Sequence, residues 1–414
     1  MTPSNVYPQH SSVTDGRLAV GGCDAGELAR EFGTPAYVVA EDDLRARARA
    51  WQQALRTHHG PNGAVVYASK AFPASAVLRT FAEEGLHVDC ASGGELHLAL
   101  RAGFDPAKVV LHGNAKSERE LHAAVEAGVG TIVLDGGDPE RLERIVPKGK
   151  RQRVLIRVTP GVHADTHAHI MTGHADSKFG YAPAVAREIA ERGWERLDVA
   201  GLHFHLGSQL FDASPFAAAM DAFTGLAPMR TYDVGGGMGA PYTRKDPVPD
   251  PDAWVQGLCE VAHAALGDDV ELLIEPGRAL VANAAVTLYT VEDVKRVRDD
   301  LAFVAVDGGM SDNLRPMLYD AVYEADLAER MGDGESFTVV GKHCESSDVL
   351  VREASLQDPR PGDVLVTPVT GAYGHAMASN YNGLPRAPVV FAADGSARLV
   401  VRRETYEDLT ARDA

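Results

Sequence analysis

The sequence predicts an α/β protein with a (β/α)8 TIM barrel followed by a C-terminal antiparallel β domain. Eight short apolar or β-branched runs recur between residues 64 and 285, and a longer helix-like stretch follows most of them. Strands and helices that alternate in this way form right-handed crossovers and a parallel sheet. Eight such units over roughly 220 residues match the count and size of a TIM barrel. A doubly wound open sheet is the alternative, because counting strands does not reveal closure.

The predicted barrel strands are short and rich in apolar residues. They cover residues 64–69, 86–92, 108–114, 131–135, 153–158, 201–207, 231–237 and 271–277. The stretches between them, such as PASAVLRTFAEEG and SERELHAAVEAG, carry apolar residues at helical spacing and end at glycine. Between Gln209 and Gly235 the chain is short for a strand exit, a helix and the next strand. The length of the sixth barrel helix therefore stays open.

The pattern of the sequence changes after residue 285. Runs such as LAFVAVDG, SFTVVGKH and DVLVTPV follow one another mostly without long helical stretches between them, which predicts antiparallel strands. Ahead of the barrel, TPAYVVAEDDLRARARAWQQAL predicts one strand and then a helix. We therefore expect an N-terminal segment, 1–43, that contributes a strand to the β domain, a barrel over 44–285, and a C-terminal β domain over 286–414.

Composition and charge exclude several classes of protein. The chain has 414 residues, of which 45% are hydrophobic, and this is globular rather than disordered composition. Its 40 Lys and Arg against 58 Asp and Glu give a formal net charge of −18, which argues against nucleic acid or an anionic membrane as partner. No apolar run approaches the ~18–20 residues of a membrane span. The first residues lack the pattern of a secretory signal, and the four cysteines are scattered, so we expect a reduced, cytoplasmic protein.

The ends of the predicted strands carry the candidate chemistry, because TIM-barrel active sites lie at the C-terminal ends of the strands. The polar or glycine residues at these ends are Lys70, Asn114, Asp135, His205 with Ser208, Gly235, Gly236 and Gly237, and Glu275 with Arg278. The triple glycine after strand seven lets backbone N–H groups approach an anion, and phosphate sites in this fold favour that region. A tight turn is the alternative reading of the three glycines.

An amine, a phosphate cradle and a carboxylate around one barrel mouth indicate pyridoxal 5′-phosphate. This cofactor needs an amine for its Schiff base, an anchor for its phosphate and a group opposite its pyridine nitrogen. Lys70 supplies the amine, and Glu275 can keep the nitrogen protonated because a carboxylate stabilises a nearby cation. A carboxylate that caps the next turn is the alternative for Glu275, given the Pro276-Gly277 that follows.

At these residues the sequence resembles the fold type III pyridoxal-phosphate decarboxylases, which have an alanine-racemase-like barrel, and among them the diaminopimelate decarboxylases. The resemblance runs from about Gly33 to Arg402. Its motifs are YASKAF, CASGGEL, LHGNAKS, RVTPGVHADTHAHIMTGHADSKFG, GLHFHLGSQ, DVGGGMG, IEPGR, SDNLRPMLYDA, CESSD and GAYGHAMASNYN. Each motif alone is weak, whereas the ordered set is highly specific.

The resemblance implies a role for each matching residue. Lys70 would carry the Schiff base, His205 would stack on the cofactor ring, and Cys344 would donate a proton in the active site of the other subunit of a homodimer. The implied cofactor-binding residues are Lys70, His205, Ser208, Gly235, Gly236, Gly237, Glu275, Pro276, Gly277, Arg278 and Tyr373. The implied substrate-binding residues are Arg278, Arg315, Tyr319, Glu345 and Tyr373.

The residue types agree with this chemistry. Decarboxylation leaves a carbanion at Cα, and an ordinary thiol, with a pKa of ~8.5, is largely protonated at neutral pH and can act as an acid. A buried inert cysteine is the alternative, but Cys344 lies in a polar stretch, CESSD. The other three cysteines, Cys23, Cys90 and Cys259, are expected to be inert.

Arg315 and Glu345 decide the expected substrate. Diaminopimelate has a distal ammonium and a distal carboxylate, whereas ornithine, lysine and arginine have only a distal cation. A guanidinium fork suits the carboxylate and a carboxylate suits the ammonium. Relatives that act on ornithine lack an arginine at this position. A surface salt bridge is the alternative for Arg315.

We therefore expect decarboxylation of meso-2,6-diaminopimelate to L-lysine and CO₂, the last step of lysine biosynthesis. The alternatives are a related decarboxylase of ornithine, lysine or arginine, and a catalytically silent homologue that dimerises with a partner. A silent homologue would be expected to lose Lys70 or Cys344, and both are present.

Four clustered histidines, His163, His167, His169 and His174, suggest a metal site at first sight. Their spacing does not fit a helical His-x-x-x-His pair with a nearby carboxylate. We expect no metal and interpret the stretch as a loop near the mouth of the barrel.

Overall fold

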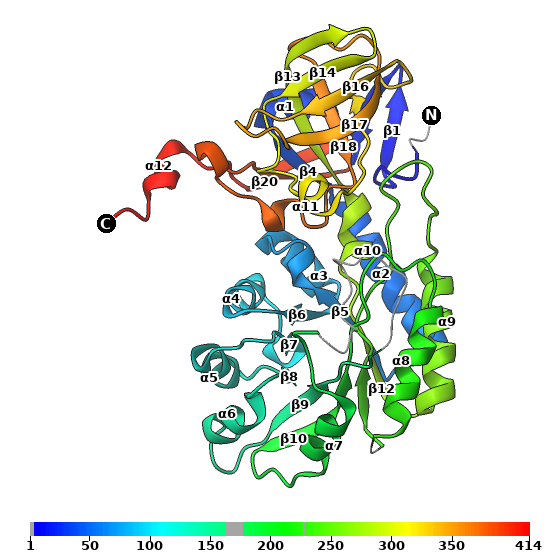
Figure 1. The fold of residues 1–414 in the computed structure, drawn as a ribbon, viewed down its shortest axis with the longest axis vertical. Helices are drawn as coiled ribbons and strands as arrows, with labels where there is room; N and C mark the ends of the chain where they lie inside the picture. The colour runs from blue at the N-terminus through cyan, green and yellow to red at the C-terminus, as the bar shows by residue number, and fades with distance from the viewer. Residues whose placement is uncertain (1–3, 162–176, 227) are drawn as a thin grey trace. The chain divides into compact units, whose positions relative to one another are not determined.

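The computed structural model describes residues 4–161, 177–226 and 228–414 (Figure 1). The chain divides into two compact units. The barrel unit comprises Ala46–Gly239 and Pro249–Ala279, and the sheet unit comprises Met1–Arg45, Ala240–Val248 and Leu280–Ala414. The sequence-based domain limits at residues 43 and 285 remain predictions. Within the described residues, no helix is long and apolar enough to cross a membrane.

The barrel unit contains a closed sheet of eight parallel strands. The strands are β5 (Gly63–Ala68), β6 (His87–Cys90), β7 (Val109–Leu111), β8 (Thr131–Leu134), β9 (Gln152–Arg157), β10 (Leu197–His203), β11 (Thr231–Asp233) and β12 (Glu271–Ile274). The last strand closes on the first, with Leu272 opposite Gly63 and Ile274 opposite Val65. The predicted barrel is confirmed, and the open-sheet alternative is wrong.

Helices precede, connect and follow the barrel strands, and those that connect them lie around the sheet (Figure 1). They are α2 (Glu41–His58), α3 (Ser75–Glu83), α4 (Gly93–Ala102), α5 (Glu118–Ala127), α6 (Asp138–Ile145), α7 (Pro183–Glu191), α8 (Ser214–Thr224), α9 (Pro251–Leu266) and α10 (Arg278–Val281), with the 3-10 turns η1 (Ser69–Ala71) and η2 (Pro106–Lys108). The sixth barrel helix, α8, has 11 residues, so the short stretch after Gln209 still holds three turns. A capping box at Ser117 begins α5, and Gly128 in the left-handed conformation ends it.

The interior of the barrel is a packed apolar core. Six strands contribute to one buried cluster, which consists of Val66, Val110, Val133, Leu155, Ala200 and Leu273. Burying each larger side chain stabilises the fold by about 1.5–3 kcal/mol. Strand β10 also approaches β11 closely, because a Cβ atom on Gly201 would lie 1.7 Å from the backbone oxygen of Thr231. The filled interior leaves the strand ends as the place for polar chemistry.

The sheet unit contains a nine-stranded sheet with the order β17-β16-β14-β13-β4-β19-β20, to which β18 and β15 are added alongside β13. Its strands are β4 (Ala36–Ala40), β13 (Ala285–Arg298), β14 (Leu301–Val306), β15 (Asp326–Leu327), β16 (Glu335–Val340), β17 (Val349–Leu356), β18 (Val364–Pro368), β19 (Val389–Ala393) and β20 (Ser396–Val401). A small sheet of β1 (Ser11–Thr14), β2 (Arg17–Val20) and β3 (Cys23–Asp24) belongs to the same unit, as do α1 (Ala25–Phe32), η3 (Ala282–Ala284), α11 (Arg315–Tyr319), η4 (His375–Met377), η5 (Tyr381–Gly383) and α12 (Tyr406–Thr410).

The large sheet is mixed, although its sequence pattern predicts antiparallel strands. Most neighbours are antiparallel, but β14 pairs parallel with β16 and β4 pairs parallel with β19. Hairpin loops force an antiparallel arrangement only on strands that follow each other directly. Residues 307–334 separate β14 from β16, and β4 comes from the N-terminal segment, so neither pair is under that constraint.

Candidate active site

The candidate residues of the barrel unit lie at the C-terminal ends of its strands. Lys70 is in η1 directly after β5, and its side chain is exposed. His205 follows β10, the glycines follow β11, and Glu275 follows β12. Because all eight strands are parallel, these ends share one rim of the barrel.

The three glycines after β11 form a turn that packs against neighbouring strand ends. Gly235 has φ +69° and Gly237 has φ +135°, a region that favours glycine. A Cβ atom on Gly236 would lie 2.0 Å from the backbone oxygen of Glu275. The N–H of Gly235 donates to Asp233 Oδ1 at 3.0 Å, and that of Gly236 donates to His205 Nδ1 at 3.3 Å. Because glycine has no side chain, the backbone of this turn can pack closely against the segments that follow β10 and β12.

A buried cation lies beside a hydroxyl group in the same unit. Arg278 begins α10, and its Nε and Nη2 lie 3.2 and 3.0 Å from Ser208 Oγ. The side chain of Arg278 is only 6% exposed. A guanidinium next to a hydroxyl group is a suitable pair for an anionic group such as a phosphate.

His205 is held as a neutral ring. Burial, and then the nearby ammonium of Lys70, lower the pKa of His205 well below its usual value. A neutral imidazole can lie against an aromatic ring without adding a buried charge.

Glu275 is a buried carboxylate between two histidines. Its Oε1 lies 2.8 Å from His112 Nε2, and its Oε2 lies 3.4 Å from His203 Nε2. Burial alone would raise the pKa of Glu275, but the two histidines lower it well below its usual value. Oε1 makes no well-aligned hydrogen bond within the described residues. A buried, ionised oxygen of this kind fits a cationic ring nitrogen.

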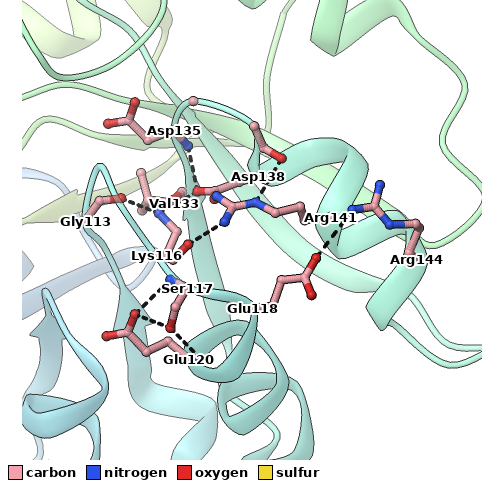
Figure 2. A network of polar contacts seen from close by, with 12 residues as sticks. Gly113, Lys116, Ser117, Glu118, Glu120, Val133, Asp135, Asp138, Arg141 and Arg144 are labelled. Atoms are coloured by element: carbon pink, nitrogen blue, oxygen red, sulfur yellow. Dashed lines mark hydrogen bonds and ion pairs between the residues drawn. The ribbon is translucent and has the colours of Figure 1, made fainter.

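The structure distinguishes Lys70 from a second lysine near the rim. Lys116 is buried, and its Nζ lies 2.6 Å from Asp138 Oδ2 and donates to the backbone oxygens of Val133, at 2.8 Å, and Gly113. Arg141 binds the other oxygen of Asp138 at 2.5 Å (Figure 2). Lys116 therefore has a structural role, because it links the loops that follow β7 and β8, whereas Lys70 is exposed.

Two other strand-end residues from the sequence analysis differ in environment. Asp135 is buried, and its Oδ2 accepts a hydrogen bond from the backbone N–H of Gly180 at 3.0 Å. Asn114 is half-buried. The four histidines of the predicted loop, His163, His167, His169 and His174, lie outside the described residues.

Arg315, in the sheet unit, is a buried cation in an aromatic box. It is 4% exposed and begins α11. Its Nη1 donates to the hydroxyl group of Tyr323 at 2.6 Å, and its guanidinium carbon lies 4.5 Å from the ring centre of Tyr242. Burial opposes the charge, yet the two tyrosines raise the pKa of Arg315 above its usual value. The surface salt bridge considered for this residue is therefore wrong.

The other predicted residues of the sheet unit lie nearer to solvent. Tyr319, at the end of α11, is 37% exposed, and Tyr373 has a backbone φ of +66°, which is strained for a tyrosine. Cys344 and Glu345 are exposed, and the backbone N–H of Cys344 donates to Asn382 Oδ1 at 3.0 Å. Glu345 also lines a cavity of about 480 Å³ within this unit, together with Met310, Leu314, Ser347, Ser379 and Tyr381.

The cysteines differ in the expected way. Cys23, Cys90 and Cys259 are buried, and burial raises the pKa of each thiol, that of Cys259 to about 11. Cys344 is the exposed one of the four. Exposure leaves this thiol accessible to a reactant.

Sequence reasoning missed the partners of Glu275. His112 lies in the motif LHGNAKS, His203 lies two residues before His205, and Asp233 ends β11. Ligand atoms of His112, His203, Asp233 and Glu275 all lie within 4.8 Å of one another, so this group could also hold a metal ion. The polar residue types at strand ends were the available signal, since apolar residues dominate the strands themselves.

Comparison with known proteins covers both units. Residues 41–282 match the family model "Pyridoxal-dependent decarboxylase, pyridoxal binding domain". The chain is 44% identical to the diaminopimelate decarboxylase of Actinosynnema pretiosum, over 99% of this chain and 95% of the relative. It is 42% identical to that of Bacillus subtilis, over 96% and 95%. The crystal structure of the M. jannaschii diaminopimelate decarboxylase with L-lysine superimposes with a TM-score of 0.90 at 31% identity, covering 98% of both chains.

Proposed function

Because this chain belongs to the diaminopimelate decarboxylases, a family of pyridoxal-dependent carboxy-lyases, we propose that it converts meso-2,6-diaminopimelate to L-lysine and CO₂. The family resemblance of the sequence motifs is thereby confirmed. The reaction would complete lysine biosynthesis, and we expect it to occur in the cytoplasm. The observation that carries the choice of substrate is Arg315, a buried guanidinium surrounded by tyrosines.

The residues of the barrel unit fit pyridoxal 5′-phosphate, the cofactor of this family. Lys70 would hold the cofactor through its amine, His205 would contact the ring face, and Glu275 would face the pyridine nitrogen. The phosphate would lie near Ser208, Gly235, Gly236, Gly237, Pro276, Gly277 and Arg278. Two observations support the fit, namely the turn in which a Cβ would clash and the buried Glu275 oxygen without an aligned hydrogen bond. When bound, the cofactor supplies an electron sink for the pair left at Cα.

The side chains of the protein divide the remaining tasks. Glu275, ionised and buried, favours a protonated ring nitrogen. Cys344 would hold a proton at Sγ and deliver it to Cα after CO₂ has left, since an exposed thiol is a suitable general acid. The family implies that the carboxylate at the D centre of the substrate is the one removed.

Recognition of the distal end of the substrate would use both charges. Arg315 would bind the distal carboxylate as a planar fork, and Glu345 would bind the distal ammonium. Tyr319, Tyr373 and Arg278 are the further proposed contacts. Ornithine, lysine and arginine would leave the buried guanidinium without a carboxylate partner, which costs several kcal/mol.

We propose a homodimer in which Cys344 and Glu345 act in the partner's site. Both residues are exposed in the monomer. Large apolar side chains of the same unit are also exposed, namely Leu318 at 48%, Val322 at 65% and Tyr381 at 42%. Exposed apolar and aromatic side chains of this kind are typical of surfaces that a second copy covers.

A substrate panel tests the proposed function. Initial rates are measured with meso-diaminopimelate, lysine, ornithine and arginine at equal concentrations and saturating cofactor. We expect turnover of meso-diaminopimelate at least ~10²-fold above the others, since these offer no distal carboxylate to Arg315. Equal rates on all four compounds would contradict the role of Arg315, and a preference for ornithine or lysine would favour the related decarboxylases.

A further inference from the structure

We infer that His112 and His203 are positioning residues that hold the carboxylate of Glu275 in one orientation and as an anion toward the cofactor's ring nitrogen. This inference rests on the proposed role of Glu275 in cofactor binding. Neither histidine is among the residues that the family motifs assign to cofactor or substrate. Both would act through Glu275 rather than through contact with a reacting atom.

The geometry gives each carboxylate oxygen its own histidine. His112 follows β7, His203 ends β10, and Glu275 follows β12, so three separate strand ends converge. His112 Nε2 is 2.8 Å from Oε1, and His203 Nε2 is 3.4 Å from Oε2. The two imidazole rings meet edge to face, with centres 4.7 Å apart and planes inclined by 69°. A carboxylate contacted on both oxygens cannot rotate without losing one contact.

Because Glu275 and both histidines are buried, the contacts between them determine whether the carboxylate is charged. His112 is 5% exposed, His203 is 1% exposed and Glu275 is 7% exposed. Water therefore has little access to the carboxylate, and an anion without polar partners in such a place would take up a proton. A protonated Glu275 could no longer stabilise a cationic ring nitrogen.

Asp233 is a second buried acid beside Glu275, and its presence is a further reason why Glu275 requires both histidines. Asp233 is fully buried, and burial together with Glu275 raises its pKa well above the usual value. The two carboxyl groups thus compete for one proton, since two adjacent buried anions repel each other. Burial lowers the pKa of His203 to about 3, so its ring is neutral and can donate from Nε2. The contacts from the two histidines favour Glu275 as the charged member of this pair.

The loop that carries His112 is itself fixed. The backbone N–H of His112 donates to the backbone oxygen of Cys90 at 2.8 Å. Lys116, four residues further on, binds the backbone oxygens of Gly113 and Val133 and the carboxylate of Asp138 (Figure 2). This network restricts the segment on which His112 lies, as expected for a residue that has to hold another in place.

A metal ion is the competing explanation for the same cluster. Two histidines and two carboxylates within 4.8 Å form a donor set that Zn²⁺ accepts. A bound metal would, however, take the oxygens of Glu275 that the proposed cofactor contact needs. The two explanations therefore exclude each other, and one experiment can separate them.

The test replaces each histidine by phenylalanine, which keeps the ring, and by glutamine, which keeps a donor. His87→Phe is the matched control, because His87 begins β6 at the opposite end of the barrel. Three quantities are measured, namely the Kd of the apoenzyme for pyridoxal phosphate, the pH at which the absorbance band of the bound cofactor changes, and kcat and KM separately. Circular dichroism checks that every variant folds.

We expect His112→Phe and His203→Phe to weaken cofactor binding and to lower kcat by ~10–100-fold each, with KM within about threefold. The spectral transition should shift in pH, and glutamine should restore most of each loss. In a Glu275→Gln background the phenylalanine substitutions should have little further effect, because residues that act through one group are not additive. His87→Phe should change none of these quantities.

The outcomes separate this inference from the proposed function. If Glu275→Gln changes cofactor affinity and spectrum but neither His112→Phe nor His203→Phe does, the inference is overturned and the role of Glu275 stands. If Glu275→Gln itself changes neither, the proposed role of Glu275 fails, and the inference fails with it. One equivalent of Zn²⁺ in the active holoenzyme, lost in His203→Phe, would also overturn it in favour of a metal site.

Discussion

The barrel unit and the sheet unit each bury a carboxyl group, with opposite effects on its charge. In the barrel unit two histidines lower the pKa of Glu275 well below its usual value, against the effect of burial. In the sheet unit burial dominates, assisted by the nearby Asp307 and Asp348, and raises the pKa of Asp312 to about 7. Burial alone therefore does not decide whether a carboxyl group is charged. The polar partners that converge on it decide.

The two units also differ in how far they bury the other candidate site residues. The barrel unit holds Glu275 and Arg278 in buried contacts at strand ends. The sheet unit buries Arg315 but leaves Cys344 and Glu345 exposed. Groups on packed strand ends are preorganised, whereas exposed loop residues depend on a further contact to be fixed. This agrees with the proposal that the cofactor site is built within one chain and the substrate site is completed by a second.

The largest expected effect separates the two lysines of the barrel. Lys70→Ala should lose the absorbance band of the bound cofactor and at least ~10³-fold in activity, because the covalent attachment is removed. Lys116→Met should keep the band but lower the free energy of unfolding by about 3–5 kcal/mol, since Asp138 then loses a buried partner. Absorbance spectra and urea unfolding of both variants measure this. If Lys116→Met folds but lacks the absorbance band of the bound cofactor, then Lys116 rather than Lys70 holds the cofactor.

The second prediction concerns the exposed residues of the sheet unit. Cys344→Ala should lower kcat by ~10²–10⁴-fold, as expected for the loss of a general acid. When Lys70→Ala and Cys344→Ala subunits are unfolded together, refolded and reconstituted with the cofactor, random pairing should restore about a quarter of wild-type activity, because half the dimers carry one intact site. Refolding each variant alone is the control. A mixture no more active than its components would place Cys344 in the site of its own chain.

The third prediction concerns the buried cation of the sheet unit. Arg315→Met should lower kcat/KM for meso-diaminopimelate by ~10²-fold or more, because the distal carboxylate would lose its buried partner. The kcat/KM for lysine should fall less, so the ratio of kcat/KM for meso-diaminopimelate to that for lysine should decrease. Arg315→Lys is the informative control, since a point charge cannot replace the planar fork. If both variants retain wild-type preference, another residue recognises the distal carboxylate.

The smallest expected effect tests the opposite charge states of the two buried carboxyl groups. The folded-state pKa of Asp312, about 7, exceeds its unfolded value near 3.8, so its protonated form stabilises the fold below pH ~4. This contribution, up to about 4 kcal/mol, is lost as the pH rises through 7. Asp312→Asn should therefore flatten the fall in stability between pH 4 and 7, while its amide oxygen can still accept from the Gly309 N–H.

Urea unfolding of wild type and Asp312→Asn across this pH range gives the comparison. The charged and titratable neighbours, Asp307, Asp348 and Arg403, remain in both proteins and cancel in the difference. Parallel stability curves for the two proteins would mean that Asp312 is ionised in the folded state throughout.

Much of the fold could be predicted from residue patterns. Each barrel strand follows from a short apolar run, and the capped start of α5 at Ser117 follows from a local motif. The sheet unit was less predictable, because β4 lies between β13 and β19, which begin 249 and 353 residues after the start of β4. Hydrophobic alternation indicates that a segment is a strand, but it does not indicate its neighbour or direction.

The sequence by itself determined the family and the residue types proposed for the site, because Lys70, Glu275, Arg315 and Cys344 stand in ordered local motifs. Only the tertiary structure decided which groups contact Glu275. His112, His203 and Glu275 are separated by 91 and 72 residues along the chain, and closure of the barrel brings them into contact. The charge of a buried group depends on distances of a few ångströms, which no local pattern contains.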